Sequence, residues 1–178
     1  MKDKDISKYL SLVLRHQPQV LGITLDESGW TEVNGLLEKM QQKGMNVDFE
    51  KLSQVVQNND KQRFAFNADQ SKIRASQGHS VSIELGLTPV QPPEVLYHGT
   101  AQANMESILK DGIQKRSRQH VHLSADEQTA IKVGQRHGKP VVLQVNSGDM
   151  NRDGHLFYLS ENKVWLTDFV EAKYIQNK

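Results

Sequence analysis

The sequence predicts an α+β protein built from two lobes. In the first half, three segments with apolar residues at helical spacing precede two short alternating segments, which indicates three helices and then a hairpin. In the second half, short strands do not alternate regularly with helices, which argues against a doubly wound parallel sheet. Between the halves, three prolines fall within five residues, and neither a helix nor a central strand tolerates them.

These features predict a first lobe over residues 1–88, a proline-rich linker over residues 89–93 and a second lobe over residues 94–178. A chain of 178 residues can form two small domains, and 37% hydrophobic with 24% charged residues is typical of a soluble globular protein. The N-terminus lacks the apolar core of a signal peptide, and apolar runs are short. We therefore expect a cytoplasmic protein without membrane association, and a monomer.

Two amphipathic helices are expected at the start of the first lobe. The first ends at Arg15 and His16, because Pro18 prevents its continuation. The second begins near Thr31 and ends at Gly44, since glycine favours the left-handed conformation that follows many helices. Their core-facing residues are Ile6, Leu10, Val13, Leu14, Val33, Leu36, Leu37 and Met40.

A third helix and a hairpin complete the predicted first lobe. Asp48 has the side chain of a helix N-cap. The alternation in residues 63–66 and 72–75, separated by a polar turn, predicts two antiparallel strands. Three helices followed by a hairpin are typical of a winged helix. The apolar residues that the third helix is expected to bury are Phe49, Leu52, Val55 and Val56.

A winged helix often binds DNA, but the helix that would enter the major groove is poorly suited to that role here. The third helix carries Lys51 beside Asp48 and Glu50, which a major-groove helix would not favour. The formal net charge of +1 also excludes a broad polyanion-binding surface. A DNA-binding regulator is therefore the less favoured alternative, and any contact with nucleic acid must be made by a few basic residues in a shaped site.

The second lobe is expected to contain short strands and two helices. The first helix spans about residues 103–110, with Met105, Ile108 and Leu109 on one side. The second is expected to open with a capping box at residues 124–127. The strands are predicted at residues 95–97, 121–123, 141–145, 156–159, 163–166 and 173–175.

Histidines in or directly beside two of these strands suggest a site for a polar ligand. His120 and His122 share one face of an extended strand, and small residues beside His98 would let a ligand approach the backbone. Residues 110–118 carry four cations against one anion, so an anionic ligand is favoured. A zinc site on the three histidines is an alternative, although no carboxylate is placed to orient them.

Other familiar chemistry has no support in the sequence. The chain contains no cysteine, which excludes disulfides and thiolate nucleophiles. Dinucleotide-binding glycine motifs, phosphate-binding loops, zinc-protease motifs and serine-hydrolase motifs are absent. Single basic residues have ordinary explanations, since Arg15 would offset a helix dipole and Arg63 could be a solvated edge charge. Only their combination with the histidine motifs favours a functional role.

Five separated motifs occur in order across both lobes, and together they are far more specific than any one of them. The motifs are Leu14–Pro18, Asp60–Phe64, Tyr97–Thr100, Arg118–Ser124 and Val164–Thr167. In this combination the chain resembles the RNA 2′-phosphotransferase family, called KptA in bacteria.

The resemblance implies a winged-helix lobe joined to an ADP-ribosyltransferase-like lobe, with NAD+ as co-substrate, a tRNA-like RNA carrying a 2′-phosphate as substrate, and no metal. Residues of both lobes would then contribute to one active site. Arg116 is an alternative to Arg118, since residues two positions apart in an extended segment point to the same side. The implied catalytic residues are Arg15, His16, Arg63 and Arg118. The implied NAD+-binding residues are His98, Gly99, Thr100, His122 and Ser124.

The implied reaction, a step of tRNA splicing, has two stages. The 2′-phosphate first becomes ADP-ribosylated with loss of nicotinamide, and transesterification then gives 2′-OH RNA and ADP-ribose 1″,2″-cyclic phosphate. ADP-ribosyltransferases carry a glutamate where this chain has Val164, and a phosphate nucleophile does not need that base. An ADP-ribosyltransferase that modifies terminal nucleic-acid phosphates or protein is the alternative, and Val164 counts against protein substrates.

Overall fold

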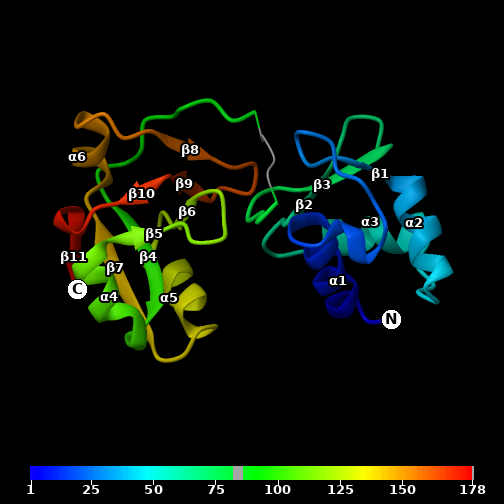
Figure 1. Cartoon of the computed structure of the whole chain (residues 1–178), viewed down its shortest axis with the longest axis horizontal. Helices are drawn as coiled ribbons and strands as arrows, with labels where there is room; N and C mark the ends of the chain where they lie inside the picture. The colour runs from blue at the N-terminus through cyan, green and yellow to red at the C-terminus, as the bar shows by residue number, and fades with distance from the viewer. Residues whose placement is uncertain (82–85, 178) are drawn as a thin grey trace. The chain divides into compact units, whose positions relative to one another are not determined.

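The computed structural model describes residues 1–81 and 86–177. The chain divides into two compact units, Met1–Gly86 (unit 1) and Leu87–Lys178 (unit 2). Both units mix helices with small antiparallel sheets, which confirms the predicted α+β class (Figure 1). The prolines predicted as a linker lie in unit 2, where Pro92 is buried and the Val90 N–H donates to the Phe157 carbonyl.

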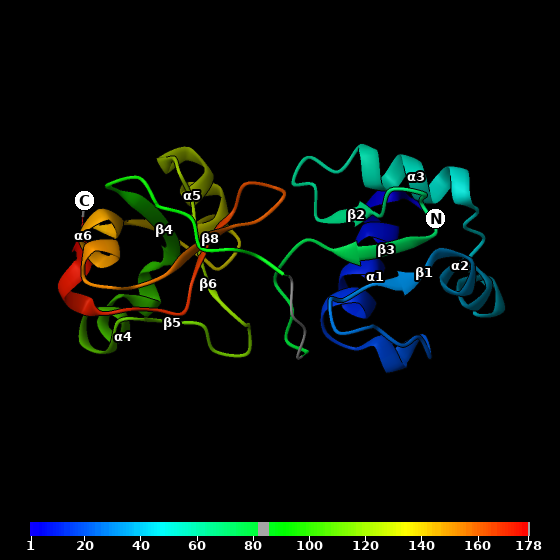
Figure 2. The ribbon, with the colours of Figure 1, turned by 90° about the horizontal axis from the view of Figure 1, so that it is seen from above.

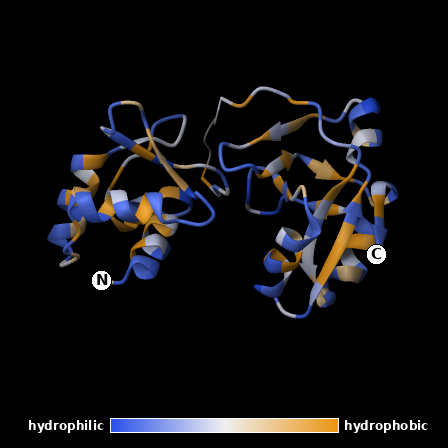
Figure 3. Ribbon diagram, turned by 180° about the vertical axis from the view of Figure 1, so that it is seen from behind, coloured by the Kyte–Doolittle hydropathy of each residue, from blue (hydrophilic) through white to orange (hydrophobic). Residues whose placement is uncertain are grey.

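The helices of unit 1 follow the predicted apolar spacing. Hydrophobic and hydrophilic residues alternate around them (Figure 3), and their apolar faces meet in one core that includes Leu10, Leu36 and Leu52. The first helix was expected to end before Pro18, and a 3-10 turn begins at that proline. The elements are α1 (Asp3–Arg15), η1 (Pro18–Val20), α2 (Val33–Gln42) and α3 (Phe49–Gln57).

A three-stranded antiparallel sheet closes this core. Strand β3 (Lys72–Ala75) lies between β1 (Thr31–Glu32) and β2 (Phe64–Phe66), as Figure 2 shows. The predicted hairpin is therefore confirmed. The prediction that a helix begins near Thr31 is wrong by two residues, because Thr31 pairs with Ile73 in the sheet and the helix follows it.

The third helix begins as predicted but buries less than predicted. The Asp48 carboxylate accepts a bond from the Lys51 N–H at 2.8 Å, so Asp48 is its N-cap. Phe49 was expected in the core, yet it is 40% exposed. As the first helical residue, Phe49 lies at the rim, where its ring stands 5.9 Å from the ring of Phe66. Val56 is only partly buried.

The described residues of unit 2 form three small antiparallel sheets. One has the order β11-β7-β4, another β6-β9-β8, and two short strands, β5 and β10, form the third. A bridge between Tyr97 and Ser124 joins β4 to the end of β6 through two backbone hydrogen bonds. The strands are β4 (Leu96–Ala101), β5 (Ile113–Gln114), β6 (Val121–Leu123), β7 (Pro140–Val145), β8 (Phe157–Leu159), β9 (Trp165–Thr167), β10 (Phe169–Val170) and β11 (Ile175–Asn177).

Helix α5 lies directly on strands β4 and β7. A Cβ atom at Gly99 would stand 1.7 Å from the Ala130 carbonyl oxygen, so only glycine permits this approach. The helical elements of unit 2 are η2 (Gln102–Asn104), α4 (Met105–Asp111), α5 (Glu127–Gln135), α6 (Ser147–Arg152) and η3 (Ala172–Tyr174).

Four predictions for unit 2 are wrong. Two helices were expected, but the described residues form a third α-helix at Ser147–Arg152. Asp126, not Ser124, caps α5, because its carboxylate accepts from the Thr129 N–H at 2.8 Å while Ser124 forms the bridge to β4. Leu109 is 50% exposed rather than part of the core side of α4. The last strand begins at Ile175, because residues 172–174 form a 3-10 turn.

Candidate functional site

A pocket of about 340 Å³ in unit 2 collects most of the predicted NAD+-binding residues. It is bounded by β4, by α4 and the loop after it, and by β6. Its polar and charged lining residues are His98, Thr100, Asn104, Ser107, Asp111, Gln114, Lys115, Arg116, Ser117, Arg118, His120, His122 and His137.

His98 presents a defined tautomer to this pocket. Its Nδ1 lies 3.2 Å from the His122 carbonyl oxygen, which can only accept, so Nδ1 carries the proton. Burial lowers the pKa of His98, and the charges of Arg118 and His137 lower it further, against the opposing effect of the bond to His122. A neutral ring with its proton on Nδ1 leaves Nε2 as an acceptor for a hydroxyl or an amide N–H.

Arg118 reaches the second pocket histidine. Its Nη1 stands 3.3 Å from Nδ1 of His122. A guanidinium only donates, so Nδ1 of His122 accepts and its proton resides on Nε2. The two histidines therefore differ, because the free nitrogen of His98 accepts whereas Nε2 of His122 donates.

The loop between β5 and β6 gives the pocket its positive charge. Lys115 forms an ion pair with Asp168 at 2.6 Å, which fixes the start of the loop. Arg116 has a φ of 54°, and both Arg116 and Arg118 are exposed. Arg118 contacts a pocket histidine, whereas no such contact is described for Arg116. Three basic residues against Asp111 favour an anionic ligand such as a diphosphate.

The other predicted NAD+-binding residues differ in their placement. Thr100 is buried, and its Oγ1 accepts from Asn104 at 3.2 Å. Gly99 also lines the pocket, but the packing of Ala130 explains why it is glycine, so ligand approach is not needed as the reason. Ser124 does not line the pocket; its backbone bonds to Tyr97.

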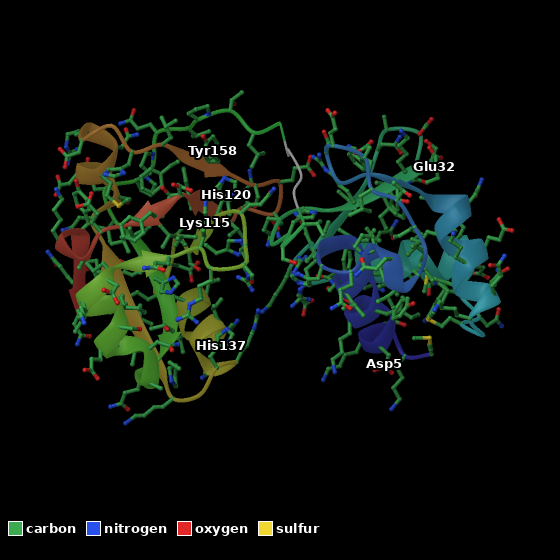
Figure 4. The ribbon with its side chains drawn as sticks, viewed as in Figure 1. Asp5, Glu32, Lys115, His120, His137 and Tyr158 are labelled. Atoms are coloured by element: carbon green, nitrogen blue, oxygen red, sulfur yellow. The ribbon has the colours of Figure 1, made fainter. Side chains whose placement is uncertain are left out.

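His120 also lines the pocket, and it packs against a tyrosine ring. Its ring lies 5.5 Å from that of Tyr158 on β8, and both are labelled in Figure 4. Burial lowers the pKa of His120. Within the described residues, no group of three His, Cys, Asp or Glu side chains is placed to hold a metal ion. The alternative of a zinc site on His98, His120 and His122 therefore has no geometric support.

Unit 1 places Arg15 and His16 against a single short segment. Arg15 is the last residue of α1, and its carbonyl accepts from the Ser80 N–H at 2.9 Å. Nδ1 of His16 lies 2.9 Å from Ser80 Oγ. Two nitrogens of the Arg15 guanidinium, Nε and Nη2, are buried. Ser80 thus holds both residues at the end of the helix.

His79 is the most buried charged or chargeable side chain of this region, at 1% exposure. Neither ring nitrogen has a hydrogen-bond partner among the described residues. Burial, followed by the charges of Arg15, His16 and Arg74, lowers the pKa of His79 to about 3. A neutral His79 therefore adds no further positive charge to the basic groups around it.

The same segment connects Arg63 to Arg15. The Arg63 carbonyl accepts from the Ser76 N–H at 2.8 Å, four residues before Ser80 bonds to Arg15. Four residues span at most about 14 Å when extended. Arg63 and Arg15 are therefore bound through their backbones to the two ends of one short segment.

Sequence reasoning missed several of these residues. His79 and Ser80 stand in a polar segment without periodicity, although the step from a strand into small and polar residues marks the end of the hairpin. Asn104 and His137 also line the pocket in unit 2, and neither belongs to a motif that the sequence analysis used.

No helix in the described part of the chain combines the length and the apolar character that a bilayer crossing requires.

Comparisons with known proteins match nearly the whole length of the chain. The model of the family described as RNA 2′-phosphotransferase, Tpt1 / KptA family, matches residues 1–169. A probable RNA 2′-phosphotransferase of Flavobacterium johnsoniae is 61% identical over 98% of this chain and 96% of its own length. Proteins with the same name from Rhodopirellula baltica (54%, covering 95% and 92%) and Fusobacterium nucleatum (50%, covering 98% of each) are also similar.

Proposed function

The chain belongs to the RNA 2′-phosphotransferase, Tpt1 / KptA family, and from this premise we propose that it removes an internal 2′-phosphate from RNA at the expense of NAD+. The names of its relatives support the phosphotransferase activity. The use of NAD+ is supported by the unit 2 pocket, where an arginine and two histidines of fixed tautomer meet. The contact between Arg118 and His122 is the observation that carries the proposal.

The residues of the pocket fit one portion of a dinucleotide. A volume of about 340 Å³ suits a nucleoside and part of its diphosphate. The loop cations provide the donors that a diphosphate needs. NAD+ would supply an electrophilic ribose carbon with nicotinamide as its leaving group. Loss of nicotinamide leaves positive charge on that ribose, and a neutral His98 adds no repulsion there.

The histidines have distinct proposed roles in binding NAD+. Nε2 of His98 accepts from a ribose hydroxyl or from the carboxamide N–H, and Thr100 lies on the same strand. Nε2 of His122 donates to a ribose oxygen, or its ring packs on the nicotinamide. Gly99 and Ser124 contribute through backbone position, since one seats α5 and the other bridges β4 to β6.

Arginines are proposed to hold the phosphate through both stages. An oxygen of the RNA 2′-phosphate bonds to the ribose carbon as nicotinamide leaves. The adjacent ribose hydroxyl then attacks phosphorus, and the RNA 2′-oxygen leaves with a proton. Guanidinium groups remain charged throughout and bind phosphate oxygens in pairs, so Arg15, Arg63 and Arg118 stabilise the charge that develops.

His16 is proposed to serve the same phosphate. Ser80 Oγ lies beside its Nδ1 and orients the ring, and we propose that His16 hydrogen-bonds a phosphate oxygen or carries the proton to the leaving 2′-oxygen. Unit 1 is accordingly proposed to be a phosphate-binding winged-helix lobe, and unit 2 an ADP-ribosyltransferase-like lobe.

A DNA-binding regulator is disfavoured by the contacts of α3. Lys51 forms an ion pair with Asp3 of α1 at 2.5 Å, so the one basic residue of this helix is engaged within unit 1.

The test is to incubate the protein with NAD+ and an oligoribonucleotide bearing one internal 2′-phosphate, and to weigh the products. We expect nicotinamide, ADP-ribose 1″,2″-cyclic phosphate and RNA that has lost its phosphate. Release of inorganic phosphate without consumption of NAD+ would contradict the proposal. RNA that retains an ADP-ribosyl phosphate as the end product would favour the alternative transferase.

A further inference from the structure

Unit 1 carries a groove whose lining includes neither Arg15 nor His16. This groove has a volume of about 520 Å³ and runs between α1 and the turn that follows α3. Its lining residues are Asp3, Lys4, Ser7, Lys8, Ser11, Val55, Asn58, Asn59, Asp60, Lys61 and Arg63. Below, this hollow is called the α1 groove.

The α1 groove is positively charged. Among its described lining residues, four are basic and two are acidic, and one of the acids, Asp3, already pairs with Lys51. Lys4 and Lys8 are exposed and one helical turn apart on α1, which puts about 6 Å of helix rise between them. Cations spaced along a groove are suited to successive phosphates of one strand.

Hydrogen bonds give the groove a defined wall. The Asn59 amide nitrogen donates to Ser7 Oγ on α1 at 3.0 Å. Its Oδ1 accepts from the backbone N–H groups of Lys61 and Arg63, at 3.2 and 3.4 Å. One side chain thus fixes the turn that carries the two cations against the helix that carries the other two.

Arg63 connects this groove to the reaction. It lines the groove, and it also belongs to the proposed phosphate-binding residues. A phosphate held by Arg63 would therefore have its neighbouring nucleotides at the mouth of the groove. We propose that the α1 groove binds the backbone of the RNA strand that flanks the 2′-phosphorylated nucleotide. This inference rests on the proposed function.

The lining also indicates which parts of the RNA strand the groove would contact. None of the eleven described lining residues is aromatic, so the groove offers no ring on which a base can stack. Lysine and serine side chains contact phosphate and sugar rather than base edges. Binding in the groove is therefore independent of base sequence and depends on salt.

The experiment compares two substrates in a Lys4→Ala/Lys8→Ala variant. One is a 2′-phosphorylated dinucleotide, too short to reach the groove, and the other is the same unit within about ten nucleotides. Binding of the unphosphorylated longer RNA is measured by fluorescence anisotropy at several salt concentrations. Lys43→Ala, which removes an exposed lysine outside the groove, is the matched control. Thermal melting verifies folding of each variant.

We expect the double variant to lose about threefold or more in kcat/KM on the longer RNA and to retain wild-type kcat/KM on the dinucleotide. The salt dependence of RNA binding should weaken by about 1.4 in the slope of log K against log salt, for two lost contacts. Unchanged binding and unchanged turnover of the longer RNA, or an equal loss on both substrates, would overturn the proposal. If neither substrate reacts with the wild-type protein, the proposed function fails. The anisotropy measurement then decides by itself whether the α1 groove binds RNA.

Discussion

Nη1 of Arg118 stands 3.3 Å from Nδ1 of His122, and the carbonyl of the same histidine lies 3.2 Å from Nδ1 of His98. His122 therefore connects the loop arginine to the buried strand of the pocket. This chain of contacts fixes the proton on a different nitrogen in each ring. It also distinguishes Arg118 from Arg116, which the sequence alone could not.

Arg118→Ala should lower kcat/KM for the 2′-phosphorylated RNA by about 100-fold or more, because one charged donor to the developing phosphate charge is lost. Arg116→Ala, two residues away, should change it by about threefold at most, a difference of about 0.7 kcal/mol. Both side chains are exposed, so neither change should lower stability. Steady-state kinetics on both variants checks this. A larger loss of kcat/KM in Arg116→Ala than in Arg118→Ala would assign phosphate binding to Arg116 instead.

His122→Ala should raise KM for NAD+ about tenfold, or about 1.4 kcal/mol in binding. The substitution removes the Nε2 donor and the ring that faces the ligand. KM for RNA should rise by a smaller factor, because His122 acts on the phosphate only through its contact with Arg118. Titrations of each substrate at saturating levels of the other separate these effects. An unchanged KM for NAD+ would remove His122 from the NAD+ site.

Gly99→Ala should destabilise unit 2 by about 1 to 3 kcal/mol or more, because the added methyl group would overlap the backbone of α5. Gly35→Ala in α2 is the matched control. There the new Cβ meets only the Glu32 Cβ at 4.0 Å, and helix propensity predicts a gain of about 0.5 to 1 kcal/mol. Denaturant unfolding of both variants measures the contrast. Equal stability of Gly99→Ala and wild type would show that α5 can move away from β4.

His79 should make unit 1 less stable in acid. Its pKa is about 3 in the folded protein, against 6.5 as the ordinary value. Between these values the unfolded chain binds the extra proton, so the free energy of unfolding falls as pH falls, by up to about 1.4 kcal/mol per pH unit. His79→Gln should remove this slope. Denaturant unfolding of wild type and variant from pH 7 to pH 4 tests it, and parallel curves would contradict it.

The fold could be predicted where the signal is local and repeated. Helices α1 and α2 and the β2–β3 hairpin follow from apolar spacing and from stop residues such as Pro18 and Gly44. The two-residue strands β5 and β10 are too short to show a pattern, and they form only by pairing with each other across more than fifty residues. The cap of α5 was misplaced because Ser124 and Asp126 both have capping side chains, and only the bridge to Tyr97 decides between them.

The candidate site shows the same division. His98, Arg118 and His122 could be selected from the sequence because they occur in compact motifs, and the structure brings them to one pocket. The role of Ser80 could not, because a serine in a polar segment has no distinguishing feature until its bond to His16 is seen. Burial of His79 likewise depends on how the segment folds back toward α1 and not on its neighbours in the chain.

Strand β4 is held on both sides, by six residue pairs with β7 and by the bridge from Tyr97 to Ser124. Side chains on a strand alternate between its faces, so a slip of one residue would turn His98 away and present Tyr97 or the bare Gly99 instead. An insertion or a deletion of one residue within β4 would therefore remove His98 from the pocket even if the strand kept its pairing with β7.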